Sequence, residues 1–171
     1  MRILTLGDDL LRQKAVPVTN LDGGSSRRDA HQWNDIVQEM FRVLKDGKGV
    51  GLAGPQIGLM QRIFVTYIDG DTPRVFINPS IIETSQETAK YEEGCLSVPG
   101  IWAHVIRPKM VKVQAWNEKS RPFTLECGGI LARVILHEYD HLEGILFIDR
   151  LPETKRNRIL DKIARRASAG R

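Results

Sequence analysis

The segment HEYDH places His137 and His141 four residues apart, with Glu138 directly after the first histidine. On an α-helix, residues four apart lie on the same face, one turn from each other, so both imidazoles can bind one metal ion. A carboxylate beside such a pair can act as a base on a water molecule that the ion activates. The sequence therefore predicts a catalytic metal site whose third ligand comes from elsewhere in the chain.

The histidines lie on the apolar stripe of a predicted helix. Ile130, Val134, His137 and His141 follow one another at spacings of 4, 3 and 4, which are positions that normally face a core. Hydrogen-bonded core histidines are the alternative interpretation. That alternative would leave three polar groups in need of partners in a dry environment, so the pattern favours a metal site.

A catalytic site of this kind needs three protein ligands and an open position. The long zinc-protease pattern H-E-x-x-H-x-x-G-x-x-H matches only up to its glycine, because position 147 is Phe147. Glu153 and Asp161, in the last predicted helix, are poorly placed for this role. Cys95 is the stronger third ligand, since it lies in a glycine-flanked loop and a metal deprotonates a thiol. A small buried hydrophobe is the alternative role, which fits Cys127 better.

Length and composition predict one domain with a normal core, spanning residues 1–171 of the 171 in the chain. Nothing marks the chain as secreted, so its two cysteines are expected to be reduced. Asp8 and Asp9 interrupt the N-terminus before an apolar segment of signal-peptide length can form, and no run approaches the ~18 apolar residues of a membrane span. We therefore expect a soluble, cytoplasmic protein that does not contact a membrane.

The periodicity predicts an amphipathic helix over residues 28–46, after a turn-rich connection at 20–26. Alternating apolar residues predict strands at 62–68, 74–78, 101–105, 110–116 and 123–127. Residues 49–58 and 92–100 are expected to be irregular loops, and 145–148 a short strand. We therefore expect an α+β fold in which short antiparallel strands surround a buried central metal-bearing helix, with one helix near each end.

Three segments carry a family resemblance. GVGLAGPQ at 49–56, EGCLS at 93–97 and HEYDH at 137–141, in this order and at these separations, resemble the three motifs of the peptide deformylases. The resemblance extends over nearly the whole chain. It implies an α+β fold and an enzyme that hydrolyses the formyl group from the N-terminal formyl-methionine of newly made proteins, releasing formate.

The same resemblance implies roles for individual residues. It makes Cys95, His137 and His141 the metal ligands and Glu138 the catalytic acid and base. The ion expected natively is Fe²⁺, with Zn²⁺, Ni²⁺ or Co²⁺ as substitutes. The side-chain amide of Gln56 and the backbone N–H of Leu96 are expected to face the formyl oxygen, and the expected contacts of the substrate peptide are Val50, Gly51 and Gly94.

Other expectations concern the substrate. Val134 lies one turn before His137 on the metal face, so it is expected to line an apolar pocket for the methionine side chain, with core packing as the alternative. Three residues depart from the family pattern. Gly54 replaces a common alanine, with a mild effect expected, Leu136 replaces a common glutamine, and Trp102 is expected to reshape the substrate entrance. Asp140 is expected to pair with an arginine such as Arg107 or Arg133, or else to be exposed.

The charge is unevenly distributed, since residues 151–171 carry seven basic and two acidic side chains in a chain of net charge +4. The remaining body is near neutral, which does not indicate a dedicated nucleic-acid domain, and no DNA partner is expected. The basic helix predicted over 152–168 is expected to be either a solvated helix or an attachment to ribosomal RNA.

Two alternatives to the deformylase hypothesis fit the residues less well. A zinc-type metalloendopeptidase lacks its third histidine because of Phe147 and has no use for Cys95. A structural metal module or an RNA-binding module would need a fourth protein ligand, and His31 and His104 do not have ligand-like spacing.

Overall fold

The computed structural model describes residues 1–19 and 27–169, so the connection predicted at 20–26 lies outside the described residues. Its α-helices are α1 (Arg27–Asp46), α2 (Gly129–Leu142) and α3 (Glu153–Ala169), and its 3-10 helices are η1 (Asp9–Arg12), η2 (Gly54–Ile57) and η3 (Phe147–Arg150). Its strands are β1 (Gly51–Ala53), β2 (Ile63–Thr66), β3 (Arg74–Thr84), β4 (Thr88–Cys95), β5 (Val98–Pro108), β6 (Met110–Trp116) and β7 (Pro122–Gly128). The predicted α+β class is confirmed.

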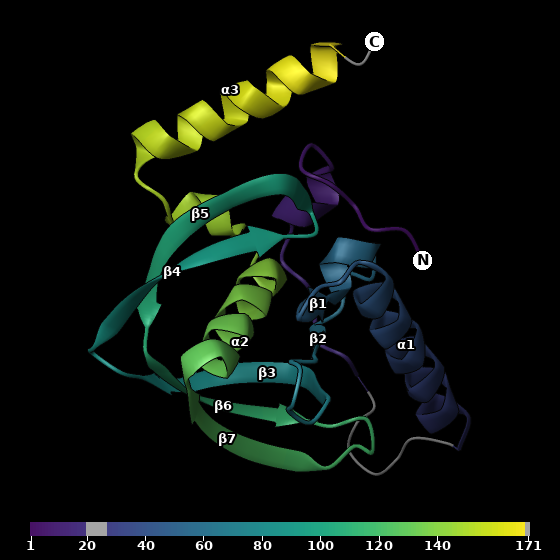
Figure 1. Cartoon of the computed structure of the whole chain (residues 1–171). Coiled ribbons are helices and arrows are strands. Elements are labelled where there is room, and N and C mark those ends of the chain that lie inside the picture. Colours follow the sequence, from purple (N-terminus) through teal and green to yellow (C-terminus); the bar gives the residue numbers. More distant parts are fainter. Residues whose placement is uncertain (20–26, 170–171) are drawn as a thin grey trace.

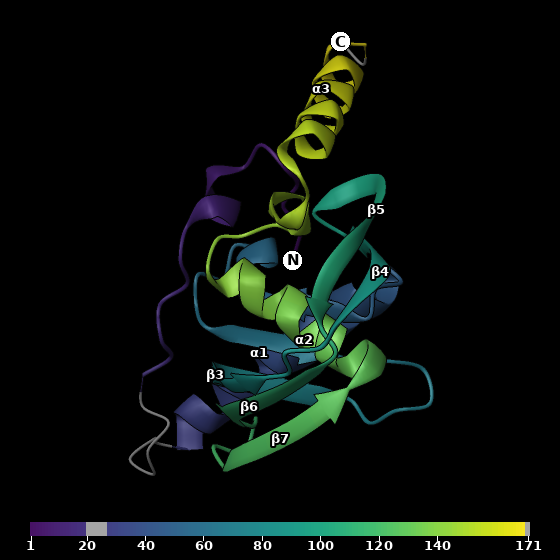
Figure 2. The same ribbon diagram turned by 90° about the vertical axis from the view of Figure 1, so that its left-hand side faces the viewer.

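The strands form two antiparallel sheets. The larger has the order β1-β2-β3-β6-β7, and the smaller is the β4–β5 hairpin. Helix α2 lies between them, with the hairpin on one side and the large sheet on the other, while α1 packs beside β1 and β2 (Figures 1 and 2). The predicted arrangement of strands around a central helix is therefore confirmed.

The position of α2 follows from its composition. Ala132 and Ile135 are fully buried and pack with residues of the large sheet, including the stacked rings of Phe64 and Phe76. Strand β6 alternates between buried and less buried positions, as a strand with one face on a core should. The apolar face of the sheet thus requires α2 as its cover.

Helix α1 confirms the predicted amphipathic helix. Val37, Met40 and Leu44 are at most 2% exposed and pack against residues of β1, β2 and β3. Trp33 and Phe41 cover the edge of this cluster. The helix begins one residue before the predicted start and ends at the predicted residue.

The prediction of an irregular loop at 92–100 was wrong. These residues form the turn end of the β4–β5 hairpin, from the last part of β4 to the start of β5, and Gly94 lies opposite Trp102. A Cβ on Gly94 would lie 2.7 Å from the Trp102 ring, so the glycine makes room for that ring. The buried charge of Glu93 also hides the apolar alternation that identifies a strand.

Two shorter segments also differ from the sequence predictions. Residues 49–58 were expected to be irregular, but they contain the short strand β1, paired with β2, and the 3-10 helix η2. Residues 145–148 were expected to include a strand, but Phe147 begins the 3-10 helix η3. Phe147 and Ile148 are buried in a cluster with residues of β5, which explains their apolar character without strand pairing.

None of the described helices combines the length and the apolar character that crossing a membrane requires.

Helix α3 extends away from the two sheets in both views and meets the body at η3 (Figures 1 and 2). Its partly buried residues Ile159, Leu160 and Ile163 pack against the cluster formed by β5 and η3. The apolar stripe of the predicted C-terminal helix is thus used for packing.

The mild effect expected for Gly54 does not agree with the structure. A Cβ at this position would lie 2.6 Å from the carbonyl oxygen of Leu59 and 3.0 Å from that of Gln61.

We expect Gly54→Ala to lower the free energy of unfolding by about 1–3 kcal/mol, because backbone atoms must shift to admit the methyl group. Urea denaturation measures this change. Gly128→Ala is the control, since its Cβ would meet ordinary contacts of 3.4 and 3.5 Å, and an equal loss in both variants would contradict the explanation.

Candidate metal centre and substrate pocket

Cys95, His137 and His141 come together at the centre of the molecule. Their potential ligand atoms all lie within 4.8 Å of one another, and the Cys95 Sγ is 3.3 Å from the His141 Nε2. Tetrahedral coordination with metal–sulfur and metal–nitrogen distances of ~2.3 and ~2.0 Å separates such atoms by about 3.5 Å. The spacing of the cluster therefore fits one metal ion.

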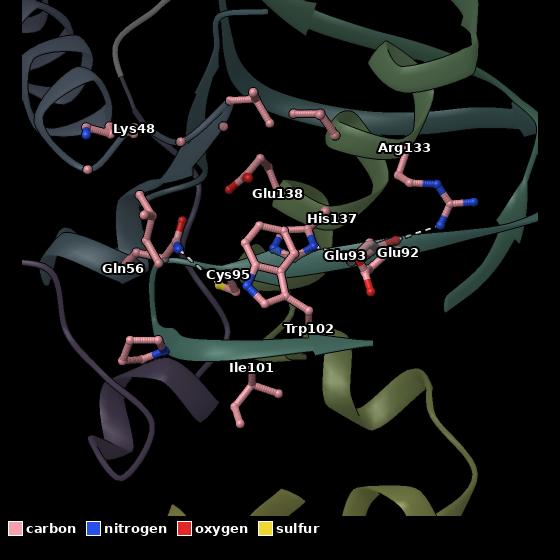
Figure 3. Close-up of a pocket in the computed structure, with 18 of the residues that line it drawn as sticks. Lys48, Gln56, Glu92, Glu93, Cys95, Ile101, Trp102, Arg133, His137 and Glu138 are labelled. Carbon is pink, nitrogen blue, oxygen red and sulfur yellow. Dashed lines mark hydrogen bonds and ion pairs between the residues drawn. The ribbon is translucent and has the colours of Figure 1, made fainter. Parts of the chain in front are cut away.

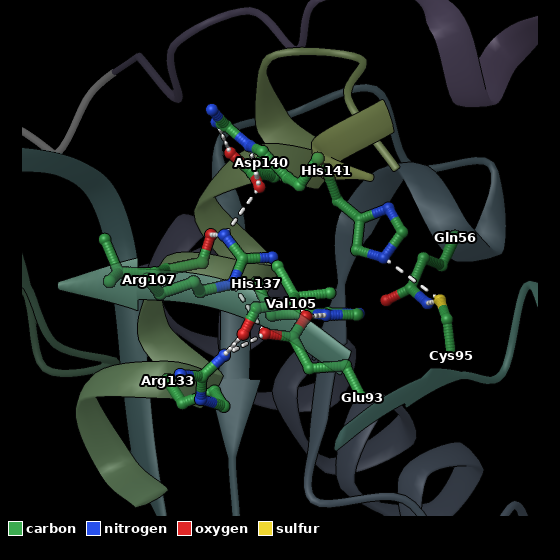
Figure 4. Close-up of polar contacts among 11 residues, drawn as sticks. Gln56, Glu93, Cys95, Val105, Arg107, Arg133, His137, Asp140 and His141 are labelled. Carbon is green, nitrogen blue, oxygen red and sulfur yellow. Dashed lines mark hydrogen bonds and ion pairs between the residues drawn. The ribbon is translucent and has the colours of Figure 1, made fainter. Parts of the chain in front are cut away.

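Two elements on opposite sides of the cluster supply these residues. Helix α2 carries His137 and His141 one turn apart on one face, with their ring centroids separated by 5.2 Å. Strand β4 ends at Cys95, directly before the turn of the hairpin, which brings the thiol beside the helix (Figure 4). Both histidines are at most 9% exposed, so the ligand set is largely shielded from water.

The buried carboxylate of Glu93 orients His137. Its Oε2 lies 2.9 Å from the His137 Nδ1, which leaves the other ring nitrogen for the cluster (Figure 4). Arg107 donates to both carboxylate oxygens at 2.7 and 3.0 Å, and Arg133 Nη1 donates to Oε1 at 2.7 Å. Burial raises the pKa of Glu93, but the hydrogen bonds with His137 and Arg107 outweigh that effect and hold the pKa well below its usual range. Glu93 is therefore a carboxylate.

Asp140 extends the same network. Its Oδ2 accepts from Arg107 Nη1 at 2.8 Å and from Arg150 Nε at 3.0 Å. The expectation that Asp140 pairs with an arginine is confirmed for Arg107. The network ties α2 to β5 and to η3, which restricts the positions of the histidines on α2.

Electrostatics in the cluster favour a bound cation. Burial lowers the pKa of His141 well below its usual value, so its ring is neutral and has a lone pair to offer. Burial also lowers the pKa of His137, but its hydrogen bonds with Cys95 and Glu93 outweigh this and raise the pKa to about 10. The surroundings of His137 therefore stabilise a positive charge. A divalent cation provides such a charge when it is bound.

Glu138 is 3% exposed, and its Oε2 has no hydrogen-bond partner among the described residues. Burial raises its pKa to about 7, although His137 and Arg107 nearby lower it. A carboxyl group with this pKa can take up and release a proton near neutral pH. A Cβ on Gly51 would lie 2.3 Å from the Glu138 Oε1, so only glycine leaves space for this side chain.

The Gln56 side chain has a fixed orientation. Its Oε1 accepts a hydrogen bond from the Ala53 N–H at 2.8 Å, which leaves the amide NH₂ on the other side. The Nε2 atom lies 3.2 Å from the Ser97 Oγ and 3.5 Å from the Cys95 Sγ. Gln56 therefore presents donors toward the cluster (Figure 3).

These residues face a cavity of about 490 Å³ (Figure 3). Its walls include the expected substrate-binding residues, which are Val50, Gly51, Gly94 and Val134. The expected donor Leu96 and the exposed ring of Trp102 also line it. The Leu96 side chain lies against Gly47 and Gly49, where a Cβ would approach it to 3.0 and 2.9 Å. The cavity has the size and the mainly apolar walls of a ligand site with a few polar groups.

The sequence predictions missed Glu93 and Ser97. Both are buried, and both position a predicted site residue. A general signal exists for Glu93, because a histidine that binds a metal nearly always donates its second N–H to a carboxylate or carbonyl group. Glu92 and Glu93 were the acidic residues nearest to Cys95, but the sequence does not show which of them is buried.

The family model described as polypeptide deformylase matches residues 1–157. The chain belongs to the peptide deformylase family. The peptide deformylase of Treponema pallidum (strain Nichols) is 43% identical over 164 residues, covering 96% of each chain. That of Neisseria gonorrhoeae is 43% identical over 168 residues, covering 97% of this chain and 95% of the relative.

Solved structures agree with this membership. The Legionella pneumophila peptide deformylase has a TM-score of 0.83 and 38% identity, covering 98% of this chain and 96% of the other. A Synechococcus elongatus peptide deformylase, solved in complex with actinonin, has a TM-score of 0.84 and 37% identity, covering 95% and 85%. Nothing in these comparisons supports the metalloendopeptidase alternative, and Phe147 is a buried core residue whose ring stacks on His137.

Removal of the Glu93 charge tests its link to the metal centre. We expect Glu93→Gln to weaken metal binding roughly 10–100-fold, because the ring of His137 loses a charged partner. Competition with a chelator measures this affinity. Glu92→Gln is the matched control, since Glu92 is the exposed neighbour on the same strand, and equal metal retention in the two variants would contradict the assignment.

Proposed function

We propose that this chain removes the formyl group from the N-terminal formyl-methionine of newly made proteins by hydrolysis, releasing formate, and that residues 1–171 act as one catalytic domain. Membership of the peptide deformylase family supports this function. One observation of the site carries the proposal: Glu138, Gln56 and the cluster residues Cys95 and His137 line the same cavity.

In this proposal Cys95, His137 and His141 hold one divalent cation. The chemistry that such a cation supplies is Lewis acidity, which activates water and polarises a carbonyl group. A thiolate with two imidazoles is a softer ligand set than three imidazoles and suits iron or zinc. We infer that Fe²⁺ is the native ion, as the family resemblance implies, and that Zn²⁺, Ni²⁺ or Co²⁺ can replace it.

Glu138 moves the proton. With its pKa near 7, the carboxylate accepts a proton from the attacking water and later donates it to the leaving amine of methionine. The formyl oxygen gains negative charge as its carbon becomes tetrahedral. The Gln56 amide, held in place by the Ala53 N–H, and the backbone N–H of Leu96 donate to this oxygen.

The substrate peptide lies in the cavity with its first side chain beside Val134. Val50, Gly51 and Gly94 offer backbone groups along the walls, so the peptide can pair as an added strand. Backbone pairing gives affinity without selecting later side chains, which suits an enzyme that meets many different N-termini. Trp102 reshapes the outer wall of this entrance.

Release of formate from formyl-Met-Ala-Ser by protein prepared without oxygen, together with its metal content, tests the function. One metal ion per chain and formate release are expected. A metal-loaded protein that cleaves internal peptide bonds and yields no formate would overturn the proposal.

Glu138→Ala should retain the metal and lower kcat by ~10²–10⁴-fold, because proton transfer loses its acid and base while the ligands remain. Steady-state kinetics and metal analysis of the same sample measure both quantities. Glu126→Ala removes an exposed carboxylate from β7 and should leave both unchanged. Loss of metal in parallel with activity would argue for a ligand role of Glu138 instead.

We also propose that α3 attaches the enzyme to ribosomal RNA. Its exposed residues Lys155, Arg158 and Lys162 contribute to the surplus of positive charge at this end of the chain. The helix extends from the body, so these side chains can reach phosphate groups while the cavity stays open (Figure 1).

Replacement of these three residues by alanine should weaken ribosome binding and lower the magnitude of the slope of log K against log salt by about 2–3. Each phosphate contact releases counterions when it forms, and the variant lacks three such contacts. Sedimentation with ribosomes at several salt concentrations measures the slope. A control triple variant replaces the exposed residues Lys45, Lys119 and Arg121, and it should keep the original slope. The same slope in all proteins would refute the attachment.

A further inference from the structure

A groove of about 300 Å³ lies between the β4–β5 hairpin and helix α3. Trp102 lines this groove and also the cavity that holds Glu138 and His137. In both views α3 lies beyond β5, on the side away from α2 (Figures 1 and 2). The groove is therefore next to the proposed active site, and the exposed ring of Trp102 is the boundary that the two hollows share.

The outer face of the hairpin forms one side of the groove. Side chains alternate between the faces of a strand, so Trp102 and His104 of β5 lie on the same face, about 6.6 Å apart along the strand. Lys90 of β4 is paired with Ile106 and shares this face. Trp102, His104 and Lys90 are all exposed. The hairpin thus presents an aromatic ring beside the active site and a lysine farther along the groove.

Helix α3 forms the other side of the groove. Lys155 lies three residues before Arg158 and four before Ile159, so these side chains share one face of the helix. Ile159 packs against the cluster formed by β5 and η3, which holds this face toward the body of the molecule. Both cationic side chains are exposed and line the groove. They therefore face the same hollow as Lys90.

The groove carries positive charge that the fold does not neutralise. Lys90, Lys155 and Arg158 form no ion pair with any carboxylate of the described residues, and none of those carboxylates lines the groove. Nearby arginines differ, since Arg150 pairs with Asp140 and Arg156 with Asp149. A cleft lined by charges of one sign attracts a ligand of the opposite sign. The groove therefore suits an anionic ligand, and we call it the basic groove.

The neighbouring cavity indicates which anionic ligand this is. In the proposed function the substrate is an extended peptide whose formyl end lies beside Glu138, and Trp102 lines the entrance by which the rest of the chain leaves. Each further residue of an extended chain advances it by ~3.3 Å, so two residues span the distance from Trp102 to His104 and four reach the level of Lys90. A shared boundary with the substrate cavity thus favours a later part of the same peptide over RNA.

We propose that the basic groove binds an acidic segment of the substrate chain, a few residues after its formyl-methionine, and so favours new proteins with Asp or Glu at those positions. This inference rests on the proposed function. Lys90, Lys155 and Arg158 attract the carboxylates of the segment. Single exposed charge pairs contribute little, so the preference depends on several carboxylates acting together.

The test compares formyl-Met-Ala-Ser-Asp-Asp-Asp-Asp with the peptide that carries Asn at the last four positions, because Asn has nearly the same size and no charge. The measured quantity is the ratio of kcat/KM for the acidic peptide to that for the neutral one, from formate release. Metal loading and the fraction of folded protein cancel in this ratio, since both peptides are assayed on the same sample without ribosomes. We expect a ratio of about 3–10 at ~10 mM salt, and near one at ~1 M salt, where charges are screened.

The double variant Lys90→Met and Arg158→Met should lower the low-salt ratio at least about twofold, because two of the three permanent charges of the groove are removed while the side-chain stems remain. Lys155→Met should lower it in the same direction, which keeps the test decisive if the double variant does not fold. The matched control is the double variant Lys119→Met and Arg121→Met, which loses the same two charges from exposed residues that do not line the groove. It should keep the ratio of the unaltered protein.

A ratio below about twofold in the unaltered protein at low salt would overturn the inference. An equal fall in the control variant would also overturn it, since overall charge would then explain the preference. A ratio near one, together with weaker ribosome binding by Lys90→Met, would assign the groove to RNA instead. Absence of formate from both peptides with unaltered protein would contradict the proposed function itself.

Discussion

The hydrogen bond between Glu93 and His137 is the interaction on which the architecture of the site depends. A carboxylate in the interior requires charged partners, and here Arg107 and Arg133 supply them from β5 and α2. Those arginines in turn fix Asp140 and the backbone of the hairpin. The position of one imidazole is thus determined by contacts that join a helix to both strands of the smaller sheet, and the chemistry of the cluster requires that whole arrangement.

The sequence predicted the elements whose patterns are governed by a single apolar face. Residues 110–116 form the predicted strand with the same bounds, and α1 differs from its prediction by one residue. In α1, the apolar spacing of Met40 and its neighbours matches the residues that are buried in the core. The HEYDH segment revealed His137, Glu138 and His141 for the same reason, since helical spacing alone brings them together. Local periodicity was sufficient wherever one neighbouring layer determines which side chains are buried.

The β4–β5 hairpin could not be predicted in this way. Its buried positions include Glu93 and Ser97, whose partners are far away in the sequence, and its Gly94 accommodates the ring of Trp102 across the hairpin. Gly51 likewise makes room for Glu138. Glycines that suggest irregular loops are here sites of close approach between elements, and such contacts depend on a tertiary arrangement that single-sequence patterns do not contain.

The location of Cys95 on a different layer from the two histidines has a mechanical consequence. Cys95 is the last residue of β4 in the smaller sheet, whereas His141 is on α2, which packs against the larger sheet. The two residues are 46 positions apart in the chain. An ion shared between them is therefore a cross-link as well as a reagent. By chain entropy alone, a cross-link of that span stabilises a fold by about 4 kcal/mol. An ion held by this cluster would thus also join the smaller sheet to the helix that packs on the larger one.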